Sequence, residues 1–293
     1  AILGITSGAL GCFTVLRKQS LFGDAIAHAA LPGIGFAYLF AGVKDSLLLM
    51  FGAAIFAWFG GIVALAITST TRIKQDAALG ITLSVFFGLG IVLLTYLQSV
   101  GGSSQGGLDR FLFGQAAALI ESDVINLGIL AAFCFAVLIL FYKEFKIITF
   151  DSSFGQSLGF PIKYLNALLT SVIVVAVVIG LHTVGVVLMV SMLIAPAAAA
   201  KQWTSNLKNM IILSAIFGGL SGIIGSMISS TTEGMSTGPV IVITITVILG
   251  ISFIFSPKQG YLFKYLRNQR KSQISLNNIK TISDKEREND GNF

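Results

Sequence analysis

Two side chains that can bind a divalent cation stand four residues apart in a strongly apolar stretch of the sequence. Asp24 and His28 occur in residues 20–33, SLFGDAIAHAALPG. Residues four apart share one face of a helix, with Cβ atoms roughly 6 Å apart. Ionisable side chains within a membrane span usually face the bundle interior or a water-filled path. We therefore interpret Asp24 and His28 as ligands on the path of a metal ion.

The ligand types narrow the choice of ion and leave other interpretations of the pair open. A carboxylate with an imidazole suits Mn(II), Fe(II) or Zn(II), whereas no cysteine or methionine cluster favours Cu(I). Two ligands are few for a tight site, but two copies facing a common axis would offer four. The pair could instead lock two helices together or relay protons. The other histidine, His182, stands at the boundary between two apolar runs and is either a ligand at the mouth of the path or an interfacial side chain.

The composition is that of an integral membrane protein. Of the 293 residues, 55% are hydrophobic and only 11% are charged, which is typical of a polytopic helical bundle. Both cysteines, Cys12 and Cys134, lie in apolar runs, so neither a disulfide framework nor a cysteine metal site is indicated. The fold class that we predict is all-α.

The basic residues give the orientation of the chain. If Arg17 and Lys18 are cytoplasmic, alternation of the spans puts every other Lys and Arg on that side except Lys44 and Arg110. Cytoplasmic loops carry an excess of Lys and Arg. The formal charge of +6 is therefore a signal of orientation and does not indicate nucleic-acid binding. It predicts a multi-pass membrane protein with a cytoplasmic C-terminus.

Apolar runs of the length that a membrane helix needs, about 20 residues, recur along the chain. The first run is short, and we expect further residues upstream of Ala1. The apolar runs on either side of His182 and Thr183 form either two short helices or one broken excursion into the membrane. We therefore predict eight or nine spans. Because Asp24 follows the cytoplasmic Arg17 by only seven residues, it is expected near the cytoplasmic edge of the membrane, unless residues 20–23 re-enter the membrane. The spans are 1–16, 23–41, 46–67, 77–97, 122–142, 164–181, 184–200, 208–229 and 238–256.

Small residues at four-residue spacing indicate where helices approach closely. Gly4 with Gly8, and Gly218 with Gly222, have the small-xxx-small spacing. Helices in lipid associate largely through such close contacts. We predict that these glycines are packing positions.

The connection 143–163 contains a predicted short cytoplasmic helix. Asp151, followed by two serines, can cap its N-terminus, and Gly159 before Pro161 can end it. The helix would place Phe150, Phe154 and Leu158 in an apolar stripe. Such a stripe needs either a partner protein or the bundle itself to cover it.

The sequence has no GxxxxGK motif followed by Ser or Thr, which is the P-loop that binds nucleotide phosphates. We therefore expect that this chain is not an enzyme, and that any ATP hydrolysis belongs to a separate subunit.

The sequence resembles one family over nearly its whole length except the tail. Residues 11–33, GCFTVLRKQSLFGDAIAHAALPG, look like the signature of the permease subunits of bacterial ATP-binding-cassette importers for manganese, zinc and iron. The similarity continues over 109–114, 150–159 and 184–198.

The resemblance implies an all-helical, type II importer-like permease that forms a homodimer. Its expected partners are a cytoplasmic ATPase pair and an extracytoplasmic metal-binding protein. The cargo is a divalent metal, manganese foremost with zinc or iron as alternatives. No cofactor is expected to be bound permanently, and ATP acts through the partner subunit.

The resemblance also assigns roles to residues of this chain. It carries the translocation ligands of the family onto Asp24 and His28. It places the ATPase-contacting coupling helix at about 149–160, with Asp151, Phe154, Leu158 and Gly159. The alternative function is a secondary carrier or channel in which Asp24 and His28 relay protons or metal. We expect residues 1–267 to form the permease domain and 268–293 a disordered cytoplasmic tail.

Overall fold

The described part of the chain is built from helices alone. The computed structural model describes residues 1–42, 46–100, 121–231, 235–257 and 260, and every regular element within them is helical. The all-α prediction is thereby confirmed. The predicted tail, 268–293, lies outside the described residues.

Eight of the described helices are long and apolar enough to cross a membrane, and α1, with 15 residues, is a shorter apolar helix. This agrees with the predicted eight or nine spans. In chain order the helices are α1 (Ile2–Leu16), α2 (Phe22–Ala41), α3 (Ser46–Thr70), α4 (Gln75–Val100), α6 (Glu121–Leu140), α7 (Tyr142–Phe150), α8 (Ser152–Ser157), α9 (Ile162–Val184), α10 (Val186–Trp203), α11 (Leu207–Thr231) and α12 (Thr237–Phe255).

The boundary between α9 and α10 is a single glycine. Gly185 has φ +83° and ψ 171°, a backbone conformation that side-chain-bearing residues rarely adopt. The chain therefore forms two separate helices here and not one broken excursion. His182 lies in the last turn of α9.

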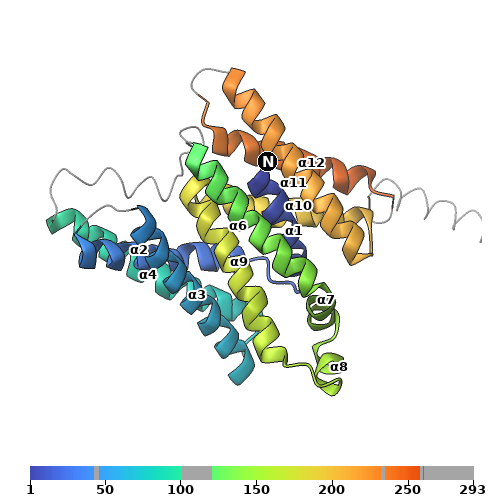
Figure 1. Ribbon diagram of the computed structural model, residues 1–293, viewed down its shortest axis with the longest axis horizontal. Coiled ribbons are helices and arrows are strands. Elements are labelled where there is room, and N and C mark those ends of the chain that lie inside the picture. Colours follow the sequence, from blue (N-terminus) through green and yellow to red (C-terminus); the bar gives the residue numbers. More distant parts are fainter. Residues whose placement is uncertain (43–45, 101–120, 232–234, 258–259, 261–293) are drawn as a thin grey trace, which may run out of the picture.

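The helices form two groups that α9 connects (Figure 1). In one group α2 packs against α3 and α4, and in the other α1, α10, α11 and α12 pack together. Helix α9 contacts α2 and α3 on one side and α1 and α10 on the other, and α6 packs against α1 and α9.

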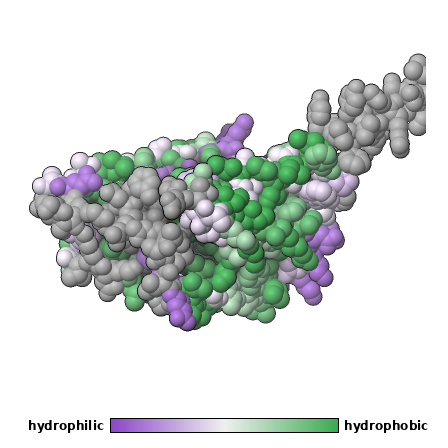
Figure 2. All heavy atoms as spheres, turned by 90° about the horizontal axis from the view of Figure 1, so that it is seen from above, coloured by the Kyte–Doolittle hydropathy of each residue, from purple (hydrophilic) through white to green (hydrophobic). Residues whose placement is uncertain are grey.

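Apolar side chains occupy both the interior and much of the outer surface. The core includes Phe13, Ile26 and Leu193, each at most 1% exposed. On the outside, Phe51 and Ile139 are 66% and 71% exposed, and Figure 2 shows hydrophobic residues over much of one face of the molecule. An exterior of this kind is suited to lipid, because soluble monomers rarely expose such extended apolar surface.

The predicted packing glycines bring α1 and α11 into backbone contact. A Cβ atom added at Gly218 would lie 2.1 Å from the carbonyl oxygen of Gly4, and one added at Gly4 would lie 2.2 Å from that of Gly218. Gly8 meets Ser214 in the same way, and the Ser214 hydroxyl donates a hydrogen bond of 2.6 Å to the carbonyl oxygen of Gly8.

We expect Gly218→Ala to destabilise the protein, because the added methyl group must push α1 and α11 apart. Overpacking of this kind costs about 1–3 kcal/mol. Thermal unfolding of the detergent-solubilised protein measures it. Gly250→Ala is the matched control, since a Cβ atom at Gly250 meets nothing within 4 Å and alanine favours the helix. Equal unfolding temperatures for the two variants would contradict the packing role.

Candidate functional site

Asp24 and His28 form a close pair in the first two turns of α2. The Nε2 atom of His28 lies 3.3 Å from the Oδ1 atom of Asp24. The side chains of His28 and Asp24 are 22% and 34% exposed, so both can be reached from outside the chain. The predicted sharing of one helical face is what brings the two groups together.

The separation of these two atoms suits two ligands of one ion. Metal ions such as Zn(II) bind imidazole nitrogen and carboxylate oxygen at about 2.0–2.2 Å. Two ligands at that distance, at tetrahedral or octahedral angles, lie roughly 3.0–3.5 Å from each other. The observed 3.3 Å falls in this interval. The separation is thus compatible with both atoms binding one divalent cation.

The ring of His28 is oriented by an aromatic neighbour from α4. Phe87 lies edge-on to the imidazole, with ring centroids 4.7 Å apart and an interplanar angle of 73°. Nδ1 of His28 is buried and has no hydrogen-bond partner among the described residues. Nε2 is therefore the nitrogen directed at Asp24. No signal in the sequence pointed to Phe87, because its position depends on how α4 packs against α2.

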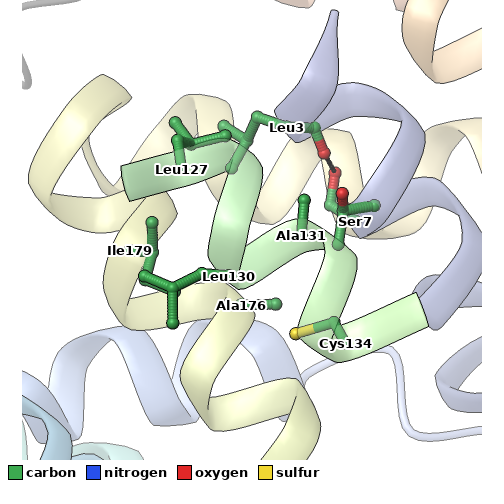
Figure 3. Close-up of a pocket in the computed structure, with 9 residues that line it drawn as sticks. Leu3, Ser7, Leu127, Leu130, Ala131, Cys134, Ala176 and Ile179 are labelled. Atoms are coloured by element: carbon green, nitrogen blue, oxygen red, sulfur yellow. Dashed lines mark hydrogen bonds between the residues drawn. The ribbon is translucent and has the colours of Figure 1, made fainter. Parts of the chain in front are cut away.

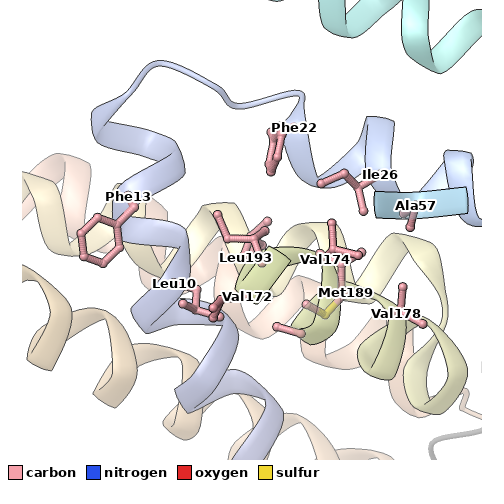
Figure 4. Packing of buried hydrophobic residues seen from close by; sticks show 14 of the residues in the cluster. Leu10, Phe13, Phe22, Ile26, Ala57, Val172, Val174, Val178, Met189 and Leu193 are labelled. Atoms are coloured by element: carbon pink, nitrogen blue, oxygen red, sulfur yellow. The ribbon is translucent and has the colours of Figure 1, made fainter. Parts of the chain in front are cut away.

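The pair lies at the level of the middle of the neighbouring helices. A Cβ atom at Gly23 would lie 2.6 Å from Leu193, which is halfway along α10. One at Gly61 of α3 would touch both Ile26 and Val174, and Val174 is halfway along α9. Figure 4 shows Phe22 and Ile26 of α2 beside Leu193 and Val174. Relative to α9 and α10, the pair lies away from the helix ends, which is what re-entry of the chain after Arg17 would produce.

A tight turn between α1 and α2 produces this depth. Helix α1 passes the level of Leu193 at Gly11 and continues to Leu16, and the chain is back at that level by Gly23. Within the turn, Lys18 has φ +57° and the backbone N–H of Gln19 donates to the carbonyl oxygen of Thr14 at 2.9 Å. Residues 17–22 thus re-enter the bundle.

His182 does not join the pair. It lies eight residues beyond Val174 on α9, about 12 Å along the axis by helical rise, and it interacts electrostatically with Asp123 of α6. Among the described residues, no group of three or more His, Cys, Asp or Glu side chains is placed to hold a metal. The role of His182 at the mouth of a path stays a prediction.

A small cavity between α1, α6 and α9 offers no comparable chemistry (Figure 3). Its polar groups include Thr6 and Ser7, whose hydroxyls donate to the carbonyl oxygens of Ile2 and Leu3 at 2.8 Å and 2.6 Å. The sulfur of Cys134 also lines it. The remaining lining residues are Leu3, Leu127, Leu130, Ala131, Ala176 and Ile179.

A second candidate site is the short helix α8, which lies within the predicted range 149–160. Asp151 is its N-cap, and the carboxylate accepts a hydrogen bond of 2.8 Å from the backbone N–H of Phe154. Gly159 has φ +82° and follows the end of the helix. Both predicted boundary signals are present in the structure, but Phe150, which was predicted on this helix, is the last residue of α7.

The apolar stripe of this segment faces outward. Phe150, Phe154 and Leu158 are 58%, 55% and 55% exposed, so the bundle does not cover them. A neighbouring side of α8 is anchored, because Gly155 is buried between Ile147 of α7 and Ile162 of α9. Helix α8 therefore presents its apolar side chains on a fixed support.

Comparison with known proteins places this chain in a family. The model of the ABC 3 transport family matches residues 1–256. The chain belongs to the ABC 3 transport family. The match includes the Asp24–His28 pair and α8, so both candidate sites lie within the part that the ABC 3 transport family shares.

Relatives in this family agree with the assignment. The chain is 49% identical over 269 residues to "Manganese transport system membrane protein MntC" of Bacillus subtilis (strain 168), which covers 92% of this chain and 62% of that protein. It is 44% identical over 272 residues to "Zinc transport system membrane protein TroC" of Treponema pallidum (strain Nichols). That match covers 93% of this chain and 91% of TroC. This chain thus spans less than two thirds of the length of the first relative.

A solved structure has the same fold. PsaBC from Streptococcus pneumoniae, determined in complex with Fab, matches with a TM-score of 0.76 and 34% identity, covering 89% of this chain and 90% of that one. The predicted resemblance to a membrane permease of an ABC transporter is confirmed.

We expect Asp151→Ala to loosen α8, because the backbone N–H of Phe154 loses its acceptor. Loss of an N-cap costs about 1 kcal/mol, which corresponds to about fivefold faster exchange of that amide hydrogen. Hydrogen exchange of the segment measures this, with Asp151→Ser as the control that retains a capping oxygen. Unchanged exchange in the alanine variant would contradict the cap.

Proposed function

We propose that this chain is the membrane-spanning permease subunit of an ATP-driven importer of divalent metal ions. The observation that carries the proposal is the Asp24–His28 pair, with its 3.3 Å separation at the middle of the helices. Family membership and the transport names of MntC and TroC support it. The expected location is a bacterial cell membrane, with the C-terminus in the cytoplasm.

A homodimer would complete the ligand set. At this pair one chain offers one carboxylate and one imidazole, both partly exposed, and no third His, Cys, Asp or Glu among the described residues joins them. Two copies related by a twofold axis would supply two of each, which is enough to replace several waters of a divalent ion. Weak, shared coordination suits a path, because the ion must also leave it.

The chemistry of the pair limits the cargo to a class. Carboxylate and imidazole together suit Mn(II), Zn(II) and Fe(II). We favour manganese, since MntC of Bacillus subtilis is the more similar of the two relatives named above. An extracytoplasmic metal-binding protein would deliver the ion and add to the selectivity.

Alternating access would couple ATP to movement of the ion. ATP binding by a cytoplasmic ATPase pair would close the two ATPases and shift α8 on each permease. The exposed Phe154 and Leu158, together with the rigid support beneath Gly155, fit such a docking role. The shift would move α2 of each permease. Asp24 and His28 would then face the cytoplasm instead of the extracytoplasmic binding protein.

We expect Asp24→Asn and His28→Ala each to abolish metal accumulation while the complex still assembles and hydrolyses ATP. The loss follows because one ligand alone does not compete with water for the ion. Uptake of radioactive Mn(II) into proteoliposomes that contain the permease, its ATPase and ATP measures the effect. Asp76→Asn is the matched control, since Asp76 also lies in the first turn of a helix but is exposed.

Two outcomes would overturn this function. Normal uptake by both variants would remove the pair from the path. Proton-driven uptake by the purified permease without its ATPase would favour the secondary carrier that the sequence left open.

We expect Phe154→Glu and Leu158→Glu to uncouple ATP hydrolysis from transport, because each puts a charge into an apolar contact. The expected result is weaker co-purification of the ATPase and at least about tenfold lower uptake. Gln156→Glu adds the same charge on the other side of α8 and should leave both unchanged. If all three variants behave alike, the stripe is not the docking surface.

A further inference from the structure

One polar contact joins the α1–α2 turn to the start of α9. A guanidinium nitrogen of Arg17 donates a hydrogen bond of 2.7 Å to the amide oxygen of Asn166, across 149 residues of sequence. Both side chains are partly buried. A hydrogen bond with a charged donor, shielded from water, is among the stronger contacts between helices.

On one side, this contact is connected to the metal pair through a stiff segment. Arg17 begins the turn, and Asp24 follows seven residues later. The N–H of Phe22 donates to the carbonyl oxygen of Gln19 at 3.1 Å, and Gln19 is 4% exposed. Together with the bond from Gln19 to Thr14, this gives the turn little freedom to absorb a displacement of Arg17.

On the other side, the contact is connected to α8. Asn166 is on α9, which begins at Ile162, and Ile162 packs against Gly155 of α8. Helices α1 and α7 meet in a second contact at the same end of the bundle. Phe13 lies edge-on to Phe145 at 6.0 Å, and both side chains are fully buried.

We infer that the hydrogen bond between Arg17 and Asn166 is a link, beside the direct packing of α9 on α2, through which movement of α8 and α9 reaches Asp24 and His28. Arg17 and Asn166 are thus positioning residues and do not bind the metal. The inference depends on the proposed transport function. A charge in this loop also serves orientation, but orientation alone does not require an acceptor on α9.

The test compares metal moved per ATP hydrolysed in proteoliposomes that contain the permease and its ATPase, with Mn(II) as cargo. We expect Asn166→Leu, which keeps the volume and removes the acceptor, to lower this ratio about tenfold while ATP hydrolysis continues. Asn166→Asp keeps an acceptor oxygen for Arg17 and should restore the ratio to within about twofold of the wild type. Arg17→Ala combined with Asn166→Leu should be no worse than either variant alone.

The control removes a different hydrogen bond from the same helix. The hydroxyl of Ser171 on α9 accepts a hydrogen bond of 2.9 Å from Nε1 of Trp58 on α3, and we expect Ser171→Ala to leave the ratio unchanged. An unchanged ratio in Asn166→Leu would overturn the inference. So would an equal fall of uptake and hydrolysis, or a loss of assembly in Asn166→Leu alone, because each indicates only structural support.

Asp24→Asn in the same assay separates this inference from the proposed function. Normal uptake by Asp24→Asn would reject the metal path itself. Abolished uptake by Asp24→Asn with an unchanged ratio in Asn166→Leu would reject only the link.

Discussion

The structure depends on placing a carboxylate at the middle of an apolar bundle. A charged group removed from water without compensation costs several kcal/mol. For Asp24, the imidazole 3.3 Å away and the remaining exposure of 34% of its side chain offset this cost. A divalent cation would satisfy the same oxygen more fully. Under the proposed function, this requirement for a partner is what would make the pair attractive to a passing cation.

Close helix contacts make the depth of Asp24 possible. Gly11 of α1 and Gly23 of α2 both pack against Leu193 of α10. A side chain at either glycine would collide with that residue, so the re-entrant turn could not bring α2 so near to α10. Because lipid gives helices little reason to associate, such backbone approaches supply much of the attraction between them.

The sequence was most informative where the signal is local. Hydropathy located the spans because a membrane helix must bury about 20 apolar residues regardless of its neighbours. Asp151 indicated the start of α8 because capping involves only the first turn. The spacing of Asp24 and His28 gave their contact for the same reason. His182 and Thr183 indicated a boundary that the structure places at Gly185, since a backbone with positive φ is decided by one glycine.

The sequence by itself determined the membrane class, the apolar helices, the Asp24–His28 pair and the short helix α8, because each follows from residue type and spacing along one helix, whereas helix α7 was not predicted. Only the tertiary structure decided the depth of the pair, the packing of Phe87 on His28 and the hydrogen bond from Arg17 to Asn166. Neither Asn166 nor its contact with Arg17 was singled out from the sequence. Contacts between distant segments depend on how helices pack, and spacing along the chain does not specify that arrangement.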